Sequence, residues 1–102
     1  MAMLHTVNKS PFERNALDSC LNTAKKGGSV LLFEDGIYGA MRGTKAADKI
    51  TQAMNDLSFY VLGPDISARG MMEDQVIDGI KVIDYGGFVD LVTEHDNVQC
   101  WL

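Results

Sequence analysis

The sequence has only two cysteines, Cys20 and Cys100, and they stand far apart in the chain. Such a pair makes neither a disulfide framework nor a C-x-x-C metal or redox site, so we expect two free thiols in a reducing compartment. The two histidines, His5 and His95, also lack the spacing of a Cys/His metal site. We therefore expect no metal and no other cofactor.

Long basic runs and long apolar runs are absent as well. No stretch of lysine or arginine exceeds Lys25-Lys26, and nine basic against fourteen acidic side chains give a net charge of −5, which argues against direct binding of nucleic acid. No apolar run approaches the roughly 18 residues that a membrane span needs. The start, MAMLHTVNKS, has no basic region followed by a long apolar stretch. We expect a cytoplasmic protein that does not enter a membrane.

The length of 102 residues predicts one domain, residues 1–102. Five short apolar runs recur along it, and the second and third have no polar interruption, which is typical of strands covered on both faces of a parallel sheet. The runs are MLHTV (3–7), VLLF (30–33), FYVL (59–62), IKVI (80–83) and VQCWL (98–102). Helical patterns separate most of them, so the order of elements predicts an α/β fold.

The helical patterns lie at about residues 10–28, 35–57 and 85–95, and the segment 63–75 is expected to be a connection with at most one helical turn after Pro64. Asp84 is expected to cap the last helix, with Phe88, Leu91 and Val92 facing inward. A chain of this size buries only about two thirds of its unfolded surface. Because three helical segments are few for two faces of a five-stranded sheet, we hypothesise that another subunit completes the cover.

Cys20 lies in the best-marked helical pattern, which starts with a capping box formed by Ser10 and Glu13 around Pro11. At 100° per residue, Cys20 falls near the centre of the apolar arc of this helix. A reactive thiol needs exposure and a nearby cation or helix N-terminus, and Cys20 lies well beyond the first turn. Packing and chemistry therefore both stay open as explanations of Cys20.

Other candidate side chains have structural explanations. Cys100 is expected to fill a small core site on the strand face opposite Trp101, with an accessible and reactive thiol as the alternative. His95 is expected to interact with the C-terminus of a helix, with a catalytic base as the alternative.

The glycines of EDGIYGAMRG (34–43) follow a strand, where α/β proteins bind ligands, but their spacing fits neither the dinucleotide fingerprint nor a P-loop. Asp35 in this turn is expected to be an N-cap, with a general base as the alternative. The turn itself, Arg42 and Arg69 are candidates for anion binding, although an exposed arginine commonly has no role beyond solvation.

Five longer segments, in this order, cover much of the chain: LHTVNKSPFERN (4–15), VLLFEDGIY (30–38), YVLGPDISARG (60–70), IDYGGFVDL (83–91) and VQCWL (98–102). They resemble the DsrH/TusB family, with a closer likeness to DsrH of sulfur-oxidising bacteria than to TusB. The resemblance implies a three-layer α/β/α sandwich with a mostly parallel five-stranded sheet, as in DsrE-like and DsrF-like proteins. It also implies assembly with such subunits into a cytoplasmic α2β2γ2 heterohexamer.

The function implied by the resemblance is a sulfur relay, in which persulfide sulfur passes to a DsrC-like acceptor during oxidation of stored sulfur. Cys20 falls where DsrH-type members carry a cysteine on the first helix, which makes it the candidate persulfide carrier, although the principal reactive cysteine belongs to the DsrE-like subunit. The alternative is a TusB-like, non-catalytic scaffold in the TusBCD relay for 2-thiouridine in tRNA. A third hypothesis is a stand-alone ligand-binding or nucleotide-binding domain that uses the turn at 35–43.

Overall fold

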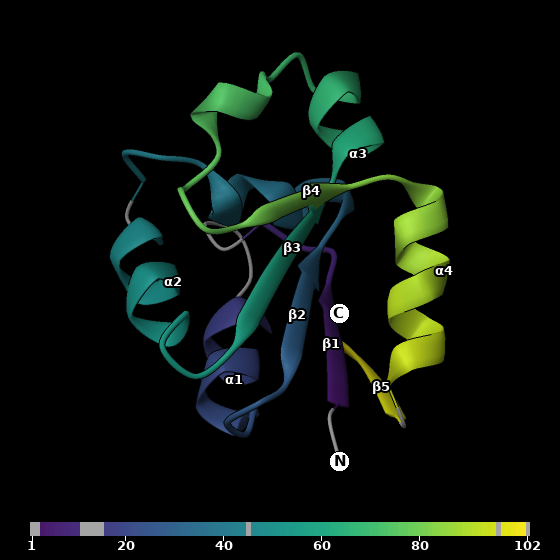
Figure 1. The fold of residues 1–102 in the computed structure, drawn as a ribbon. Coiled ribbons are helices and arrows are strands. Elements are labelled where there is room, and N and C mark those ends of the chain that lie inside the picture. Colours follow the sequence, from purple (N-terminus) through teal and green to yellow (C-terminus); the bar gives the residue numbers. More distant parts are fainter. Residues whose placement is uncertain (1–2, 11–15, 45, 96, 102) are drawn as a thin grey trace.

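The chain folds around one sheet of five parallel strands. The computed structural model describes residues 3–10, 16–44, 46–95 and 97–101. The strands lie in the order β4-β3-β2-β1-β5, and every neighbouring pair is parallel (Figure 1). They are β1 (Met3–Val7), β2 (Ser29–Leu32), β3 (Ser58–Leu62), β4 (Lys81–Ile83) and β5 (Asn97–Trp101). Each predicted apolar run forms a strand, so the expected α/β fold is confirmed.

Burial explains the difference in sequence between central and edge strands. β2 is buried along its whole length, and β1 is buried at every position after Met3. Parallel strands in the middle of a sheet have both faces covered, which requires apolar side chains at successive positions. The edge strands β4 and β5 are half-buried or exposed, and they accommodate polar side chains such as Lys81 and Gln99.

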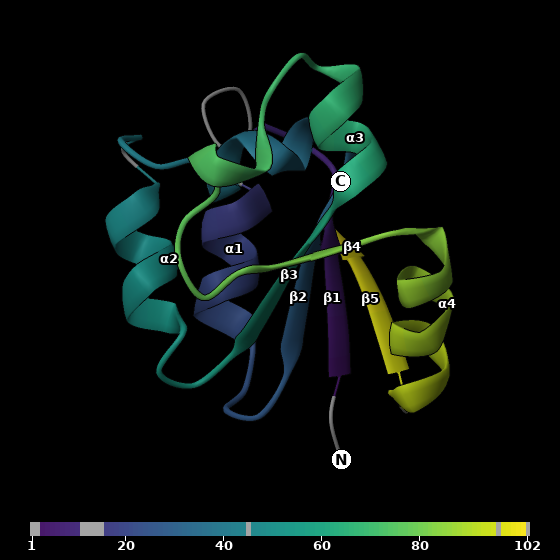
Figure 2. The same cartoon turned by 45° about the horizontal axis from the view of Figure 1, so that its top comes forward.

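The helices lie on both faces of the sheet. They are α1 (Ala16–Thr23), α2 (Ala47–Ala53), α3 (Gly63–Ala68) and α4 (Tyr85–Glu94), with short 3-10 helices η1 (Glu34–Ala40) and η2 (Glu73–Gln75). α1 and α2 cover one face, and α4 lies on the other (Figures 1 and 2). None of the described helices is long and apolar enough to cross a membrane.

The handedness of the crossovers explains this division. The connections β1-α1-β2 and β2-α2-β3 step in one direction along the sheet, whereas β4-α4-β5 steps back over three strands. Because parallel crossovers are right-handed, opposite steps place their helices on opposite faces.

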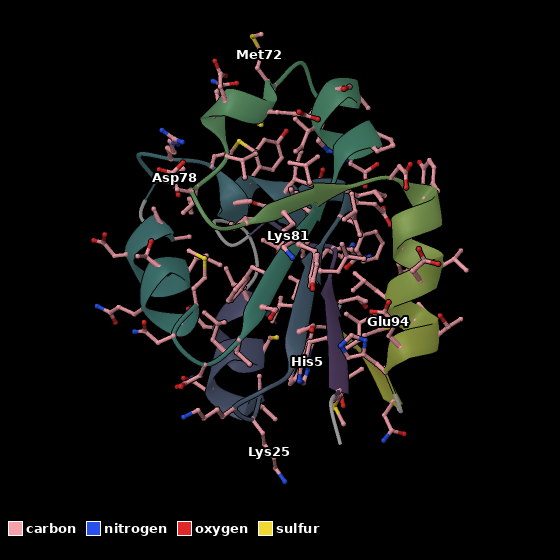
Figure 3. The ribbon with its side chains drawn as sticks, viewed as in Figure 1. His5, Lys25, Met72, Asp78, Lys81 and Glu94 are labelled. Atoms are coloured by element: carbon pink, nitrogen blue, oxygen red, sulfur yellow. The ribbon has the colours of Figure 1, made fainter. Side chains whose placement is uncertain are left out.

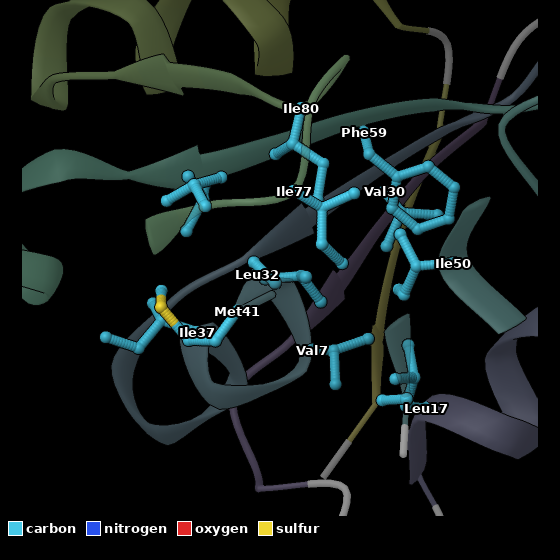
Figure 4. Close-up of a cluster of buried hydrophobic side chains, with 14 of the residues drawn as sticks. Val7, Leu17, Val30, Leu32, Ile37, Met41, Ile50, Phe59, Ile77 and Ile80 are labelled. Atoms are coloured by element: carbon cyan, nitrogen blue, oxygen red, sulfur yellow. The ribbon is translucent and has the colours of Figure 1, made fainter. Parts of the chain in front are cut away.

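The larger apolar cluster fills the space between the sheet and the helices α1 and α2 (Figure 4). Phe59 of β3, Ile50 of α2 and Leu17 of α1 all contribute to it, and each is at most 2% exposed. At the carboxyl ends of the strands, the apolar cluster is completed by Ile37 of η1 and Ile66 of α3. This face of the sheet is well covered except beside β5.

The opposite face has a much smaller cluster, which joins Leu4 and Leu31 of the sheet to Leu91 of α4. α4 alone among the described helices lies against this face (Figures 1 and 2). Two valines on this side of the protein lie outside the cluster. Val98 of β5 is 43% exposed, and Val89, on the outer side of α4, is 59% exposed. The uneven cover is what the hypothesis of a completing subunit anticipates.

Two local predictions about helices are wrong. The segment 63–75 has more than one helical turn, because α3 runs for six residues with Pro64 at its start and Ile66 buried. Val92 of α4 is 39% exposed and does not face inward as Leu91 does. The narrow cover of this face explains the difference, since a single helix on a sheet buries only one stripe of side chains. The predicted capping box involves Pro11 and Glu13, which lie outside the described residues.

Asp84 caps α4 as predicted, because its carboxylate accepts a hydrogen bond of 2.8 Å from the Gly87 backbone N–H. Asp84→Ala removes this acceptor and is expected to lower the free energy of unfolding by about 1 kcal/mol. Urea denaturation measures the loss. Asp84→Asn, which keeps an acceptor oxygen, is the matched control, and an equal loss in both variants would contradict the capping role.

Candidate functional site

Cys20 lies on the inner side of α1, where it is 0% exposed and belongs to the larger apolar cluster. Its predicted position in the apolar arc of the helix is therefore confirmed. Burial raises the pKa of the Cys20 thiol from 9.0 to about 12, because the charged thiolate loses its hydration. Sulfur transfer needs a thiolate that reaches the donor sulfur. The described chain by itself gives Cys20 neither property, and its role as a persulfide carrier stays a prediction.

Cys100 is exposed, so the prediction that it fills a core site is wrong. It pairs in register with Thr6 of β1, on the sheet face that carries α4. Strand alternation correctly places it opposite Trp101, whose indole contacts His5 on the other face. The face that holds Cys100 is uncovered at β5, because α4 contacts the centre of the sheet through Leu91.

The glycine-rich turn after β2 is closed by groups of the chain itself. η1 begins at Glu34, which has a φ of 48°, and Asp35 lies within its first turn, so the predicted N-cap role of Asp35 is wrong. Arg69 Nε lies 3.1 Å from the Asp35 carboxylate. The Glu34 backbone N–H donates to the Asp65 carboxylate at 2.6 Å. A carboxylate thus occupies the donor that an anion at this turn would use, which disfavours the anion-binding alternative.

Arg42, a second candidate for anion binding, is also engaged. Its Nη2 forms an ion pair with Asp78, and its Nε donates to the Val76 carbonyl at 2.9 Å. These two contacts connect the segment that follows η1 to the segment that precedes β4. The arginine therefore has a structural explanation.

His95 follows α4, and its Nδ1 lies 2.6 Å from the Leu91 carbonyl. A carbonyl only accepts, so Nδ1 carries a proton and donates it, which confirms the predicted interaction with the helix C-terminus. The other ring nitrogen lies 2.9 Å from the Ser29 hydroxyl. The described residues hold no cluster of three or more His, Cys, Asp or Glu side chains that could bind a metal ion.

His5 and Trp101 form a contact that the sequence does not predict. The Trp101 Nε1–H donates to His5 Nδ1 at 3.1 Å, and the ring centroids lie 6.2 Å apart. Both alternating patterns, MLHTV and VQCWL, place these rings on a definite strand face, but they do not reveal that β5 lies beside β1. Burial lowers the pKa of His5, because the charged imidazolium would lose its hydration.

Comparison with known proteins gives consistent results. The family model described as DsrH like protein matches residues 9–98. Protein TusB of Pectobacterium parmentieri is 38% identical over 100 residues, which cover 97% of this chain and 100% of that protein. Protein TusB of Pectobacterium carotovorum subsp. carotovorum (strain PC1) is 35% identical over 99 residues, with the same coverage.

Among solved structures, the crystal structure of the ychN protein from E. coli superposes with a TM-score of 0.82, over 98% of each chain. The two sequences are 14% identical, so this likeness concerns the fold alone. It agrees with the parallel five-stranded sheet and with the placement of helices on both of its faces.

Proposed function

The chain belongs to the DsrH-like protein family, and from that premise we propose that it is a subunit of a cytoplasmic sulfur relay. In such a relay, the outer sulfur of a cysteine persulfide passes from one carrier protein to the next by attack of a thiolate. The step needs no metal or cofactor. The family match over residues 9–98 is the observation that carries this proposal.

We propose further that this chain works within a heterohexamer of the α2β2γ2 type, with DsrE-like and DsrF-like subunits or their TusD and TusC counterparts. The thin cover on the α4 side of the sheet supports the need for partners, because Val98, Val89 and Cys100 are exposed there. Apolar side chains exposed together on one side of a small protein commonly mark an interaction site.

Within this complex, the structural role is better supported than the carrier role. Cys20 is buried and its thiol is protonated near neutral pH, so a donor persulfide meets no nucleophile there. On this account the chain completes the complex and positions the reactive subunit. Carriage of sulfur by Cys20 would need a partner that moves α1 away from the sheet.

The destination of the sulfur has two candidates, and the similar proteins support the first of them better than the second. The names and full-length coverage of the TusB relatives support the relay that supplies 2-thiouridine formation in tRNA. The presence of Cys20 on the first helix, at the position where DsrH-type members carry a cysteine, supports instead the oxidation of stored sulfur with a DsrC-like acceptor. Deletion of the gene separates the two, since the first predicts loss of tRNA thiolation and the second loss of sulfur oxidation.

Co-purification of the tagged chain from its own cells tests the assembly. We expect it to bring down two related small chains in equal amounts, and the assembled complex to transfer sulfur from a persulfide donor to an acceptor. Cys20→Ala is expected to leave both assembly and transfer unchanged, because the buried thiol serves packing. Transfer is measured by mass spectrometry of the acceptor.

Cys100→Ala, which removes the exposed thiol, is the matched control. A complex that contains Cys20→Ala, assembles normally and has lost transfer would contradict the structural role and establish Cys20 as a carrier. A chain that purifies alone, without related subunits, would contradict the whole proposal.

A further inference from the structure

A cavity of about 250 Å³ opens at the end of the sheet where β1 and β5 begin and α1 finishes. The sequence motifs did not indicate it, and the sulfur-relay proposal does not use it. At about 30 Å³ for each water molecule, it has room for several waters, and it is smaller than a typical drug-binding pocket. A ligand for this cavity would therefore be small.

His5 lines this cavity, and Trp101 leaves one nitrogen of its ring without a hydrogen bond among the described residues. The other, Nδ1, accepts the hydrogen bond from the Trp101 indole, which can only donate, so the proton of the neutral imidazole is on Nε2. Within the described residues the His5 ring makes no other hydrogen bond. His5 is 3% exposed, and it lines the cavity wall. Trp101 thus fixes an oriented N–H donor at the wall of the cavity.

The remaining polar lining also consists of groups that can donate. The exposed lysines Lys25 and Lys26 line it after the end of α1, and Asn97 and Gln99 of β5, which carry side-chain amides, line it as well. No carboxylate is among the described side chains that line the cavity. Neither lysine forms an ion pair with another described residue. In a protein of net charge −5, such a group of donors and positive charges complements an anion.

The position of the lysines after α1 has a simpler partial explanation, because cations near a helix C-terminus stabilise the helix. That explanation accounts for Lys25 and Lys26. It does not account for His5 of β1 or for Asn97 and Gln99 of β5, which come from other elements and line the same cavity.

We propose that this cavity is a binding site for a small oxyanion of the phosphate or carboxylate type. The His5 Nε2–H and the two side-chain amides orient the oxygens of the anion, and the lysine ammonium groups supply its counter-charge. The Met3 side chain forms an apolar part of the wall, so the site also accommodates a small apolar substituent on the anion.

The test is a titration of the full chain with inorganic phosphate, followed in ¹H–¹⁵N NMR spectra at constant ionic strength. We expect saturable shifts of the Trp101 indole N–H, which reports on the His5 ring, and of the Asn97 and Gln99 side-chain amides. Acetate, titrated in the same way, distinguishes a carboxylate site from a phosphate site. The double variant Lys25→Gln, Lys26→Gln is expected to weaken binding roughly tenfold or more, because both counter-charges are lost.

Lys81→Gln is the matched control, because Lys81 is an exposed lysine on β4, at the opposite edge of the sheet (Figure 3). It is expected to leave the affinity unchanged. The proposal is overturned if neither anion shifts the Trp101 indole beyond the change that sodium chloride produces. It is equally overturned if the double variant binds as tightly as the unchanged chain, or if Lys81→Gln weakens binding as much.

Discussion

Iodoacetamide is expected to alkylate Cys20 of the folded chain about 1000-fold more slowly near neutral pH than it alkylates an ordinary thiol. The reagent attacks the thiolate, and burial raises the pKa of Cys20 from 9.0 to about 12, which lowers the thiolate population by that factor. Complete burial of the side chain slows the reaction further. Peptide mass spectrometry after timed alkylation measures the rate at each cysteine separately.

The pH dependence follows from the sign of the shift. A raised pKa keeps Cys20 protonated in the folded chain, so its alkylation rate should rise about tenfold for each pH unit until the pH approaches about 12 or the chain unfolds. Cys100 is exposed and is the internal control in every sample. Rapid labelling of Cys20 in the folded chain, with near-UV circular dichroism unchanged, would show that α1 opens readily and would revive the carrier role.

Gly36→Ala is expected to lower the free energy of unfolding by about 3 kcal/mol, or to prevent folding. A Cβ atom at Gly36 would lie 2.1 Å from the Val7 carbonyl oxygen, which is much closer than any real contact. That oxygen cannot move without cost, because it accepts a hydrogen bond of 3.1 Å from the Phe33 backbone N–H. The added methyl group would thus separate η1 from the carboxyl end of β1.

Gly43→Ala is the matched control for this clash. Gly43 has a φ of 75° and nothing within 4 Å of a built Cβ, so alanine there meets only the conformational cost of about 1 kcal/mol. Urea denaturation measures the free energy of unfolding of both variants, and so compares the cost of the clash with the cost of the positive φ. If Gly36→Ala lowers the free energy of unfolding no more than Gly43→Ala does, the expected clash with the Val7 carbonyl oxygen is contradicted.

The strands and the longer helices could be predicted from sequence because each has a strong local signal. The unbroken runs VLLF and FYVL indicate central strands, and Asp84 identifies the start of α4 through its capping chemistry. α3 was missed as a full element because six residues are too few to establish a helical period. Its stability comes from burial of Ile66 rather than from any pattern in the sequence.

The surroundings of the candidate functional residues were harder to predict, because they depend on which helices and strands become neighbours in the fold. Alternation assigned Cys100 to the correct strand face but could not say whether that face is covered, since the path of α4 decides this. The hydrogen bond between Trp101 and His5 likewise depends on the strand order, which places β5 beside β1. The position of Asp35 in the sequence predicts a helix cap, whereas its carboxylate pairs with Arg69 from a distant segment.

The placement of β5 beside β1 has a consequence for how the protein is made. β1 is the first strand to be synthesised, and one of its edges pairs with β2, but the other edge pairs with residues 97–101 at the far end of the chain. Until residues 97–101 have been made, the nascent chain therefore exposes an unpaired edge of an inner strand, and such edges invite association with other chains. The sheet can close on this side only after almost all of its other elements have been synthesised.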